Sequence, residues 1–320
     1  MTVLGPVAPA ALGVTDAHSH LYIAPVPGGA ADAPVLTDVA GVAREMAGFR
    51  RLGGGAIVDC QPGGCGRDGN VLRGLAEETG VHVIAATGFH RRVYYPPDAP
   101  LFTLSATAAA AYFLAEIRHG LAETRDEAPS PQLSPEGRGG EAVYPGVIKI
   151  AAEATLDASP PALFEAAAEV CKATGYAIEM HTERGASVEA FLAFFGGRGV
   201  SPRLVFCHVD KRPDFGLHRE LAAAGVLLEY DTFFRPKYDP ERGVWPLLGR
   251  MAAAGLAGQV ALATDMADPA LWAELGGGPG LAGIFSLIKA RLERMGLPDD
   301  TIAGLLSGNI ATRLSVYRTF

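Results

Sequence analysis

GVTDAHSH, residues 13–20, is a short apolar run that ends in two histidines, and it decides between two folds. Chains that alternate apolar strands with helices form either an open, doubly wound sheet or a closed barrel. An open nucleotide-binding sheet carries a glycine-rich phosphate loop directly after its first strand. Here the run is followed by LYIAP (21–25), which has no such fingerprint. The first strand and its loop therefore favour the barrel.

Seven more apolar runs follow along the chain, nearly continuous as in strands that are buried on both faces. With the first, the expected strands span residues 13–20, 55–60, 82–88, 146–152, 176–182, 203–209, 225–231 and 259–265. Helical patterns span residues 38–51, 69–79, 106–124, 160–174, 186–195, 214–224, 241–254 and 280–295. Several helices are followed by a glycine, the expected C-terminal stop: Gly80, Gly175, Gly225 and Gly255. The count of eight units predicts an α/β fold, a (β/α)₈ barrel, as a single domain over residues 1–320.

One segment interrupts this alternation. TRDEAPSPQLSPEGRGGEA (124–142) is rich in proline, glycine, serine and charge, and it has almost nothing to bury. We expect a flexible surface insertion before the fourth strand, and we assign no chemistry to it.

Composition excludes several classes of protein. The net charge of −8 argues against a nucleic-acid partner. No apolar run approaches the ~18 residues that a membrane span needs, and the start, MTVLGPVAPAALG, lacks the basic region of a signal peptide. The four cysteines do not resemble a disulfide framework. We therefore expect a cytoplasmic protein that acts on a small molecule.

Barrel enzymes build their sites where the strands end, so the residues at those ends are the candidates for chemistry. The expected strands deliver His18, His20, Lys149, His181, His208 and Asp265. Taken alone, each residue could have a purely structural role. A histidine at a strand end can be a polar core residue, and the pair Thr264–Asp265 can cap the next helix. Together, four histidines, a lysine and an aspartate from five strands are typical of a two-metal hydrolase.

Lys149 is the least expected member, because it lies among apolar residues in the strand GVIKIAA (146–152). A buried, unpaired ammonium is costly, so this lysine needs a partner or a modification. An ammonium cannot bind a metal ion, but the carbamate that a lysine forms with CO₂ has two oxygens and could bridge two cations. Carboxylation of Lys149 would also remove the buried charge.

The motifs resemble, in order, those of the phosphotriesterase family of the amidohydrolase superfamily, which includes phosphotriesterase-like lactonases. The resemblance covers almost the whole chain. It lies in DAHSHLYI (16–23), VDCQPGGCGRDGNVLRGLAEETGVHVIAATGFH (58–90), GVIKIAAE (146–153), EMHTERG (179–185), FCHVD (206–210), LATDMAD (262–268) and LLSGNIATRLSV (305–316).

The resemblance implies a site with two divalent metal ions, for which zinc is expected and manganese, cobalt or iron also suit. His18, His20 and Asp265 would bind the buried ion, His181 and His208 the more exposed one, and carboxylated Lys149 would bridge them with a hydroxide. That hydroxide would attack the substrate while Asp265 accepts and returns the proton. Asp210 could extend a proton path, or it could form a loop salt bridge. The resemblance also suggests a homodimer.

Three loops that should follow strands at the mouth of the barrel are basic, although the chain is acidic. They are FHRRVYYPP (89–97), DKRPD (210–214) and FFRPKYDPERGVW (233–245). Arginine and lysine clusters hold phosphate or carboxylate groups. We therefore expect a lactone or ester with an anionic group, such as a phosphorylated sugar lactone. The candidate substrate-binding residues are Arg91, Arg92, Tyr94, Arg235, Lys237 and Tyr238, and Lys211 and Arg212 could join the basic group.

Three other functions stay open. A phosphotriester or phosphodiester hydrolase of the same family is one, although YDTFFRPKYDP (230–240) lacks the histidine that organophosphate-degrading members have after strand seven. A mononuclear amidohydrolase or deaminase would need no lysine in the fourth strand, and metal content per chain discriminates it. A catalytically silent ligand-binding barrel is the third, and the presence of all six candidate ligands speaks against it.

Overall fold

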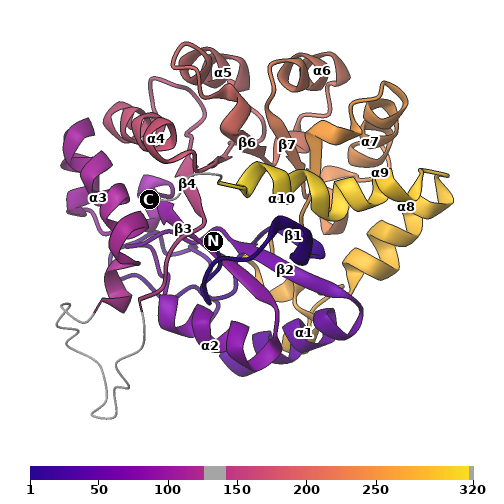
Figure 1. Ribbon diagram of the computed structural model, residues 1–320, viewed down its shortest axis with the longest axis horizontal. Coiled ribbons are helices and arrows are strands. Elements are labelled where there is room, and N and C mark those ends of the chain that lie inside the picture. The colour runs from indigo at the N-terminus through magenta and orange to yellow at the C-terminus, as the bar shows by residue number, and fades with distance from the viewer. Residues whose placement is uncertain (126–141, 317–320) are drawn as a thin grey trace.

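Eight parallel strands lie side by side in chain order in the computed structural model, which describes residues 1–125 and 142–316 (Figure 1). The strands are β1 (Val14–Ser19), β2 (Gly54–Asp59), β3 (His82–Gly88), β4 (Val147–Ala151), β5 (Ile178–His181), β6 (Leu204–Cys207), β7 (Leu227–Tyr230) and β8 (Val260–Leu262). Every predicted strand is present. Each pairs in parallel with the next, from β1 with β2 to β7 with β8.

The barrel closes where the end of β8 meets β1. Thr264 donates its main-chain N–H and its hydroxyl to the Asp16 carboxylate, at 2.9 and 2.5 Å. The next residue, Asp265, donates its N–H to the carbonyl of His18 at 2.9 Å. These contacts join the two strands at their carboxyl ends, so the predicted (β/α)₈ barrel is confirmed.

Helices surround the strands (Figure 1). They are α1 (Val39–Arg51), α2 (Gly69–Thr79), α3 (Ala106–His119), α4 (Pro161–Thr174), α5 (Val188–Gly196), α6 (Phe215–Ala223), α7 (Val244–Ala253), α8 (Ala290–Arg294), α9 (Asp299–Ala303) and α10 (Asn309–Leu314). Aspartates cap several of them; Asp68, for example, accepts from the N–H groups of Asn70 and Val71. The predicted glycine stops are confirmed, since Gly80 and Gly175 end α2 and α4 in the left-handed conformation.

Two helix boundaries differ from the prediction. The helix predicted over 106–124 ends at His119, because Gly120 leaves the helix with a φ of +92° and a short 3₁₀ turn follows. The helix predicted over 280–295 begins as a π-helical segment, Ile284–Lys289, and continues as α8. Residues 126–141, most of the predicted insertion, lie outside the described part of the chain.

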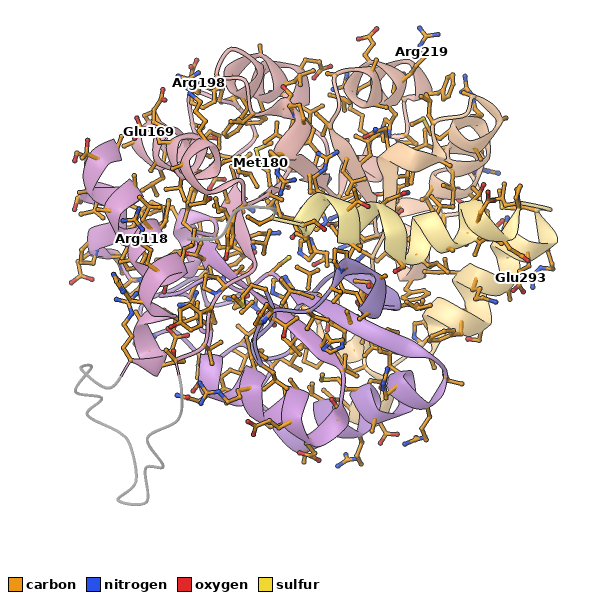
Figure 2. All side chains as sticks on the ribbon, viewed as in Figure 1. Arg118, Glu169, Met180, Arg198, Arg219 and Glu293 are labelled. Atoms are coloured by element: carbon orange, nitrogen blue, oxygen red, sulfur yellow. The ribbon has the colours of Figure 1, made fainter. Side chains whose placement is uncertain are left out.

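Small apolar side chains fill the interior of the barrel near its amino-terminal end. Ala17, Ala56 and Val205 pack there against Ile310 and Leu314 of α10, which covers the amino-terminal end. Charged side chains such as Arg219 and Glu293 lie on the outer surface (Figure 2). Because apolar side chains fill the amino-terminal half of the barrel interior, the polar residues of the interior are concentrated toward its carboxyl-terminal end. Among the described residues, we find no helix with the length and apolarity to span a membrane.

Candidate metal centre

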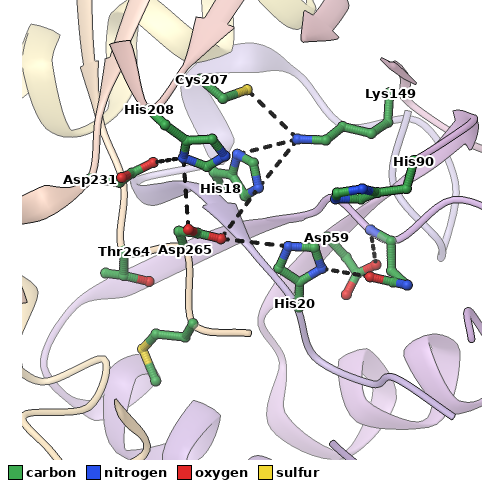
Figure 3. Close-up of polar contacts among 12 residues, drawn as sticks. His18, His20, Asp59, His90, Lys149, Cys207, His208, Asp231, Thr264 and Asp265 are labelled. Atoms are coloured by element: carbon green, nitrogen blue, oxygen red, sulfur yellow. Dashed lines mark hydrogen bonds and ion pairs between the residues drawn. The ribbon is translucent and has the colours of Figure 1, made fainter. Parts of the chain in front are cut away.

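Side chains from five strands meet at the carboxyl-terminal end of the barrel. They are all six candidates from the strand ends: His18, His20, Lys149, His181, His208 and Asp265. Asp265 Oδ1 lies 3.7 Å from His20 Nε2 and 3.8 Å from His18 Nε2. Lys149 Nζ lies 3.3 Å from His18 Nε2 (Figure 3). The His208 ring centroid is 4.8 Å from that of His18 and 4.9 Å from that of His181.

Two of these histidines have a hydrogen-bond acceptor at Nδ1. Gln61 Oε1 lies 2.8 Å from His20 Nδ1, and Asp231 Oδ2 is hydrogen-bonded to His208 Nδ1. Glu229 Oε1 lies 2.9 Å from His18 Nδ1, but this contact lacks the geometry of a hydrogen bond. An oxygen acceptor requires Nδ1 to carry the proton, which leaves the lone pair on Nε2. Acceptors that bind the other ring nitrogen in this way orient metal-binding histidines.

The protonation states also suit a metal ion. Burial lowers the pKa of His20 to about 4, and burial holds the pKa values of His18 and His208 well below the usual value. Burial raises the pKa of Asp265, but His208 and Arg235 outweigh it, so that pKa is lowered overall. Neutral imidazoles and an ionised carboxylate are the donor set that Zn²⁺ and similar ions take. The residues present therefore fit divalent metal ions.

Two of the six residues occupy unusual backbone conformations. His208 and Asp265 have φ values of +62° and +48°, in the left-handed region that non-glycine residues rarely adopt. Strain of this kind persists where the surroundings hold it in place, and it clusters at active sites. Here it turns both side chains into the same cluster.

Lys149 has acidic neighbours that the sequence did not reveal. Its Nζ lies 3.7 Å from Cys207 Sγ, and Glu179 stands beside it in the register of β4 and β5. Burial lowers the pKa of Lys149, but the thiols of Cys207 and Cys60 and the carboxylates of Glu179 and Glu229 raise it by more. The pKa of Lys149 is therefore raised overall, a direction that favours the ammonium, although none of the ion pairs of the described residues includes Lys149.

The sequence did not identify four polar neighbours of the cluster, which are Gln61, Glu179, Glu229 and Asp231. Two of them, Glu179 and Glu229, nevertheless carried a usable signal. Glu179 and Glu229 are charged residues inside apolar strands, as Lys149 is, and both are fully buried. Asp231 directly follows β7, and Gln61 lies in the loop after β2. Nothing local marks that glutamine as a partner of His20, which is 41 residues away.

Asp210 has contacts that the sequence did not predict, and its part in a proton path stays a prediction. Its buried Oδ2 accepts from the N–H groups of Asp231 and Thr232, at 3.1 and 2.9 Å, and from the Thr232 hydroxyl at 2.6 Å. The salt bridge expected with Lys211 or Arg212 is not formed. Asp210 instead holds the start of the loop that carries Asp231, and so it positions the partner of His208.

Arg91 lies beside His181 and is already paired. Its guanidinium lies 2.9 Å from both Glu153 Oε2 and Glu183 Oε2. Glu183 Oε2 is in turn 3.8 Å from His181 Nε2, which has no hydrogen-bond partner among the described residues. The pair of glutamates offsets the charge of this predicted substrate-binding residue.

Arg235 lies directly at the cluster. Its Nη2 donates to Asp265 Oδ2 at 3.0 Å and also to the Asp265 carbonyl. Lys211 and Lys237 both lie near Tyr238, with each Nζ 5.4 or 5.2 Å from the ring centroid. These cations therefore lie near Asp265 and Tyr238, and the anion site that the loop sequence predicted stays a prediction.

Two cations expected at the mouth point elsewhere. Arg92 donates to two main-chain carbonyls of its own loop and lies over the Phe102 ring, 4.8 Å from the centroid. Arg212 pairs with Glu189 at 2.9 Å, and both side chains are exposed. Neither arginine therefore joins the basic group that was expected at the mouth, because each guanidinium contacts nearby partners instead.

A cavity of about 340 Å³ opens beside the cluster. Its polar lining includes the four histidines of the cluster, Asp265, Gln61, His90 and Tyr94. The Tyr94 ring packs edge-on against His90, with centroids 4.9 Å apart. A substrate in this cavity would reach the cluster directly, and Tyr94 lines it as predicted.

The Gln61→Ala variant is expected to bind divalent metal about 10- to 100-fold more weakly, because His20 loses the acceptor that fixes its tautomer. Competition with a chelating dye measures this affinity. Gln259→Ala is the matched control, since that side chain contacts Arg313, on the helix that covers the other end of the barrel. Equal affinity of both variants would contradict the role of Gln61.

Comparisons with known proteins agree with this geometry. The model of the phosphotriesterase family matches residues 1–129 and 134–313. A phospho-furanose lactonase of Mycoplasmopsis synoviae is 25% identical over 327 residues, which cover 96% of this chain and 89% of that protein. An N-acetyltaurine hydrolase of Rattus norvegicus is 28% identical over 266 residues, covering 72% of this chain and 71% of the relative. The crystal structure of a lactonase from Listeria monocytogenes superimposes with a TM-score of 0.85 over 99% of both chains; at 20% identity, this likeness shows the fold alone.

Proposed function

The chain belongs to the phosphotriesterase family and is a metal-dependent hydrolase of ester bonds; from this premise we propose that it uses two cations to open a lactone with an anionic group. The observation that carries the proposal is the convergence of four histidines, Lys149 and Asp265 beside one cavity. A phosphorylated sugar lactone is the substrate class that we favour.

His18, His20 and Asp265 would hold one cation, and His181 and His208 the other, with Lys149 between them as a carbamate. When bound, such cations lower the pKa of a water molecule and polarise the carbonyl group of the substrate. Zinc suits this donor set best, and manganese, cobalt or iron would also fit.

Asp265 is placed to handle the proton of the reaction. Its carboxylate faces the cavity, and its lowered pKa keeps it ionised at neutral pH, so that it can accept a proton from the attacking water. Arg235 fixes the orientation of this carboxylate through the 3.0 Å contact to Oδ2. The other carboxylate oxygen lies nearest to His18 and His20.

Recognition of the anionic group would fall to Arg235, Lys211, Lys237 and Tyr238. Lys211 and Lys237 each lie close to the Tyr238 ring, with Nζ 5.4 and 5.2 Å from its centroid, and Lys237 is exposed. The names of two relatives support an anionic substrate, because a phospho-furanose carries a phosphate and N-acetyltaurine a sulfonate. Arginine and lysine bind both groups by charge-assisted hydrogen bonds.

The proposal is tested by a panel of lactones with and without a phosphate group, assayed on protein loaded with zinc or manganese. N-acetylated sulfonates and phosphotriesters belong in the panel as competing classes. Preferential turnover of phosphorylated lactones would support the proposal, and about two metal ions per chain would support the two-cation site. Turnover of none of the lactones would contradict it.

The Lys237→Ala variant is expected to lower kcat/KM for phosphorylated lactones by about 10- to 100-fold, with little effect on uncharged lactones, because one charge-assisted contact is lost. The ratio of the two kcat/KM values is the measurement. Arg242→Ala is the matched control, since that side chain on the same loop is 90% exposed. An unchanged ratio in Lys237→Ala would remove Lys237 from the anion site.

A further inference from the structure

The barrel interior holds a second group of donor side chains, deeper than the six-residue cluster. They are Glu179 of β5, Cys207 of β6 and Glu229 of β7, all fully buried, and these three residues form the inner group. Glu179 lies two residues before His181, so both side chains point to the same face of the strand. Glu179 Oε1 lies 3.9 Å from Cys207 Sγ and 3.6 Å from His18 Nδ1.

The donor atoms of the inner group have a spacing that suits a metal ion. Glu229 Oε1 lies 2.9 Å from His18 Nδ1, and one donor atom from His18 and from each member of the inner group lie within 4.8 Å of one another. A tetrahedral zinc ion with bonds of about 2.0–2.3 Å holds its donor atoms roughly 3.3–3.8 Å apart. Small shifts of these side chains would therefore close the inner group around one ion.

The carboxylates of the inner group also lack partners. Both oxygens of Glu229 and the Oε2 atom of Glu179 have no hydrogen-bond partner among the described residues. Buried polar atoms are almost always paired, and an unpaired one can mark the place of an ion. This observation does not depend on the spacing of the donor atoms, and it points independently to a ligand.

Lys149 supplies a positive charge beside the inner group. Its Nζ lies 3.7 Å from Cys207 Sγ (Figure 3). Burial raises the pKa of each member of the inner group, and the Lys149 ammonium opposes that rise. As a carbamate, Lys149 would change from a cation into an anion. The inner group would then hold either protons or another cation.

We infer that the inner group binds a third divalent cation of the zinc type, inside the barrel and deeper than the two-cation cluster. This inference goes beyond the proposed function and rests on it in one respect, the carbamate of Lys149. Two carboxylates and a thiolate suit Zn²⁺ and Co²⁺ better than Mn²⁺, because thiolate is a soft ligand. Cys207 releases its proton to solvent as the ion binds, and His18 Nδ1 offers a fourth donor atom.

Cobalt tests the third site, because it can replace zinc and reports on sulfur ligands. Metal-free protein is titrated with Co²⁺ in bicarbonate buffer, and bound cobalt is measured together with the near-ultraviolet charge-transfer band of a cobalt–thiolate bond. In the wild type we expect about three ions per chain, one of which produces the band. The six ligands of the two-cation cluster include no sulfur, so that cluster cannot produce the band.

Two variants and one control identify the ligands. Cys207→Ser should bind about two ions per chain and show no band. Cys171→Ser, which changes a buried thiol of α4 outside the inner group, should match the wild type. Glu229→Gln keeps the thiol and should also lose the third ion, which tests the site even if Cys207→Ser does not fold. A band that survives Cys207→Ser would overturn the third site.

The titration requires no turnover, so this inference and the proposed function can fail separately. A thiolate band in a protein that hydrolyses no lactone would support the third site and contradict the proposed function. Lactone hydrolysis by a wild type that shows no band, with about two ions per chain, would leave the proposed function standing and overturn the third site. Manganese should fill only the two-cation cluster, so manganese-loaded protein should keep about two ions per chain.

Discussion

The Asp265→Asn variant is expected to hydrolyse its substrate about 100- to 10,000-fold more slowly than the wild type at saturating metal. The carboxylate faces the cavity and lies 3.7 Å from His20, and its pKa is lowered, so it is an ionised base at the cluster that a substrate in the cavity can reach. An amide of the same shape cannot accept the proton. Steady-state kinetics with saturating zinc or manganese measures the loss in kcat.

The control for this variant is Asp268→Asn, three residues further along the same loop. Asp268 caps a short 3₁₀ turn by accepting from the N–H of Ala270 at 2.9 Å, and it does not line the cavity. We expect its kcat to stay near that of the wild type. Metal content should be measured for both variants, because Asp265 is also a proposed ligand. A wild-type rate in metal-replete Asp265→Asn would exclude Asp265 as the base.

The strand ends could be predicted from the sequence because two independent patterns coincide there. Buried parallel strands appear as apolar runs, and a polar residue that closes such a run, as His181 and His208 do, points to the carboxyl end of the barrel. The helix ends were predictable where glycine follows, as at Gly80 and Gly175. The helix α3 was predicted too long because Gly120 was not read as a stop.

The partners of the histidines could not be predicted, because each contact joins residues far apart in the chain. Gln61 and His20 are 41 residues apart, and Asp231 and His208 are 23 apart. The partners of Arg91 and Arg92 could not be predicted either. The composition of a loop shows its charge but not which nearby acceptors pair with that charge.

Lys149→Ala is expected to have the second large effect, on both activity and stability. The loss of a proposed ligand should lower kcat/KM by about 100-fold or more, since loss of a hydrogen-bond partner of a ligand already costs about 10- to 100-fold. Removing one partner from a buried charged group should also destabilise the fold by about 3–5 kcal/mol, because Glu179 and Glu229 would lose their cationic neighbour. Kinetics and chemical denaturation measure the two effects. Lys289→Ala, which removes an exposed ion pair with Glu293, should change stability by no more than about 0.5 kcal/mol.

The chemical state of Lys149 needs a separate measurement, because either state would make the variant inactive. If Lys149 is a carbamate, wild-type protein loaded with metal in ¹³C-bicarbonate will show a labelled carbamate carbon by NMR, and Lys149→Ala will not. If Lys149 remains an ammonium beside Glu179, no labelled carbon will appear, yet the loss of stability will persist. The free energy of unfolding of metal-free Lys149→Ala, compared with that of the metal-free wild type, tests whether the ammonium stabilises the fold. A carbamate would add negative charge next to two buried carboxylates, and only bound cations could offset it. Carboxylation should therefore depend on metal, and a labelled signal that survives complete metal removal would contradict this coupling.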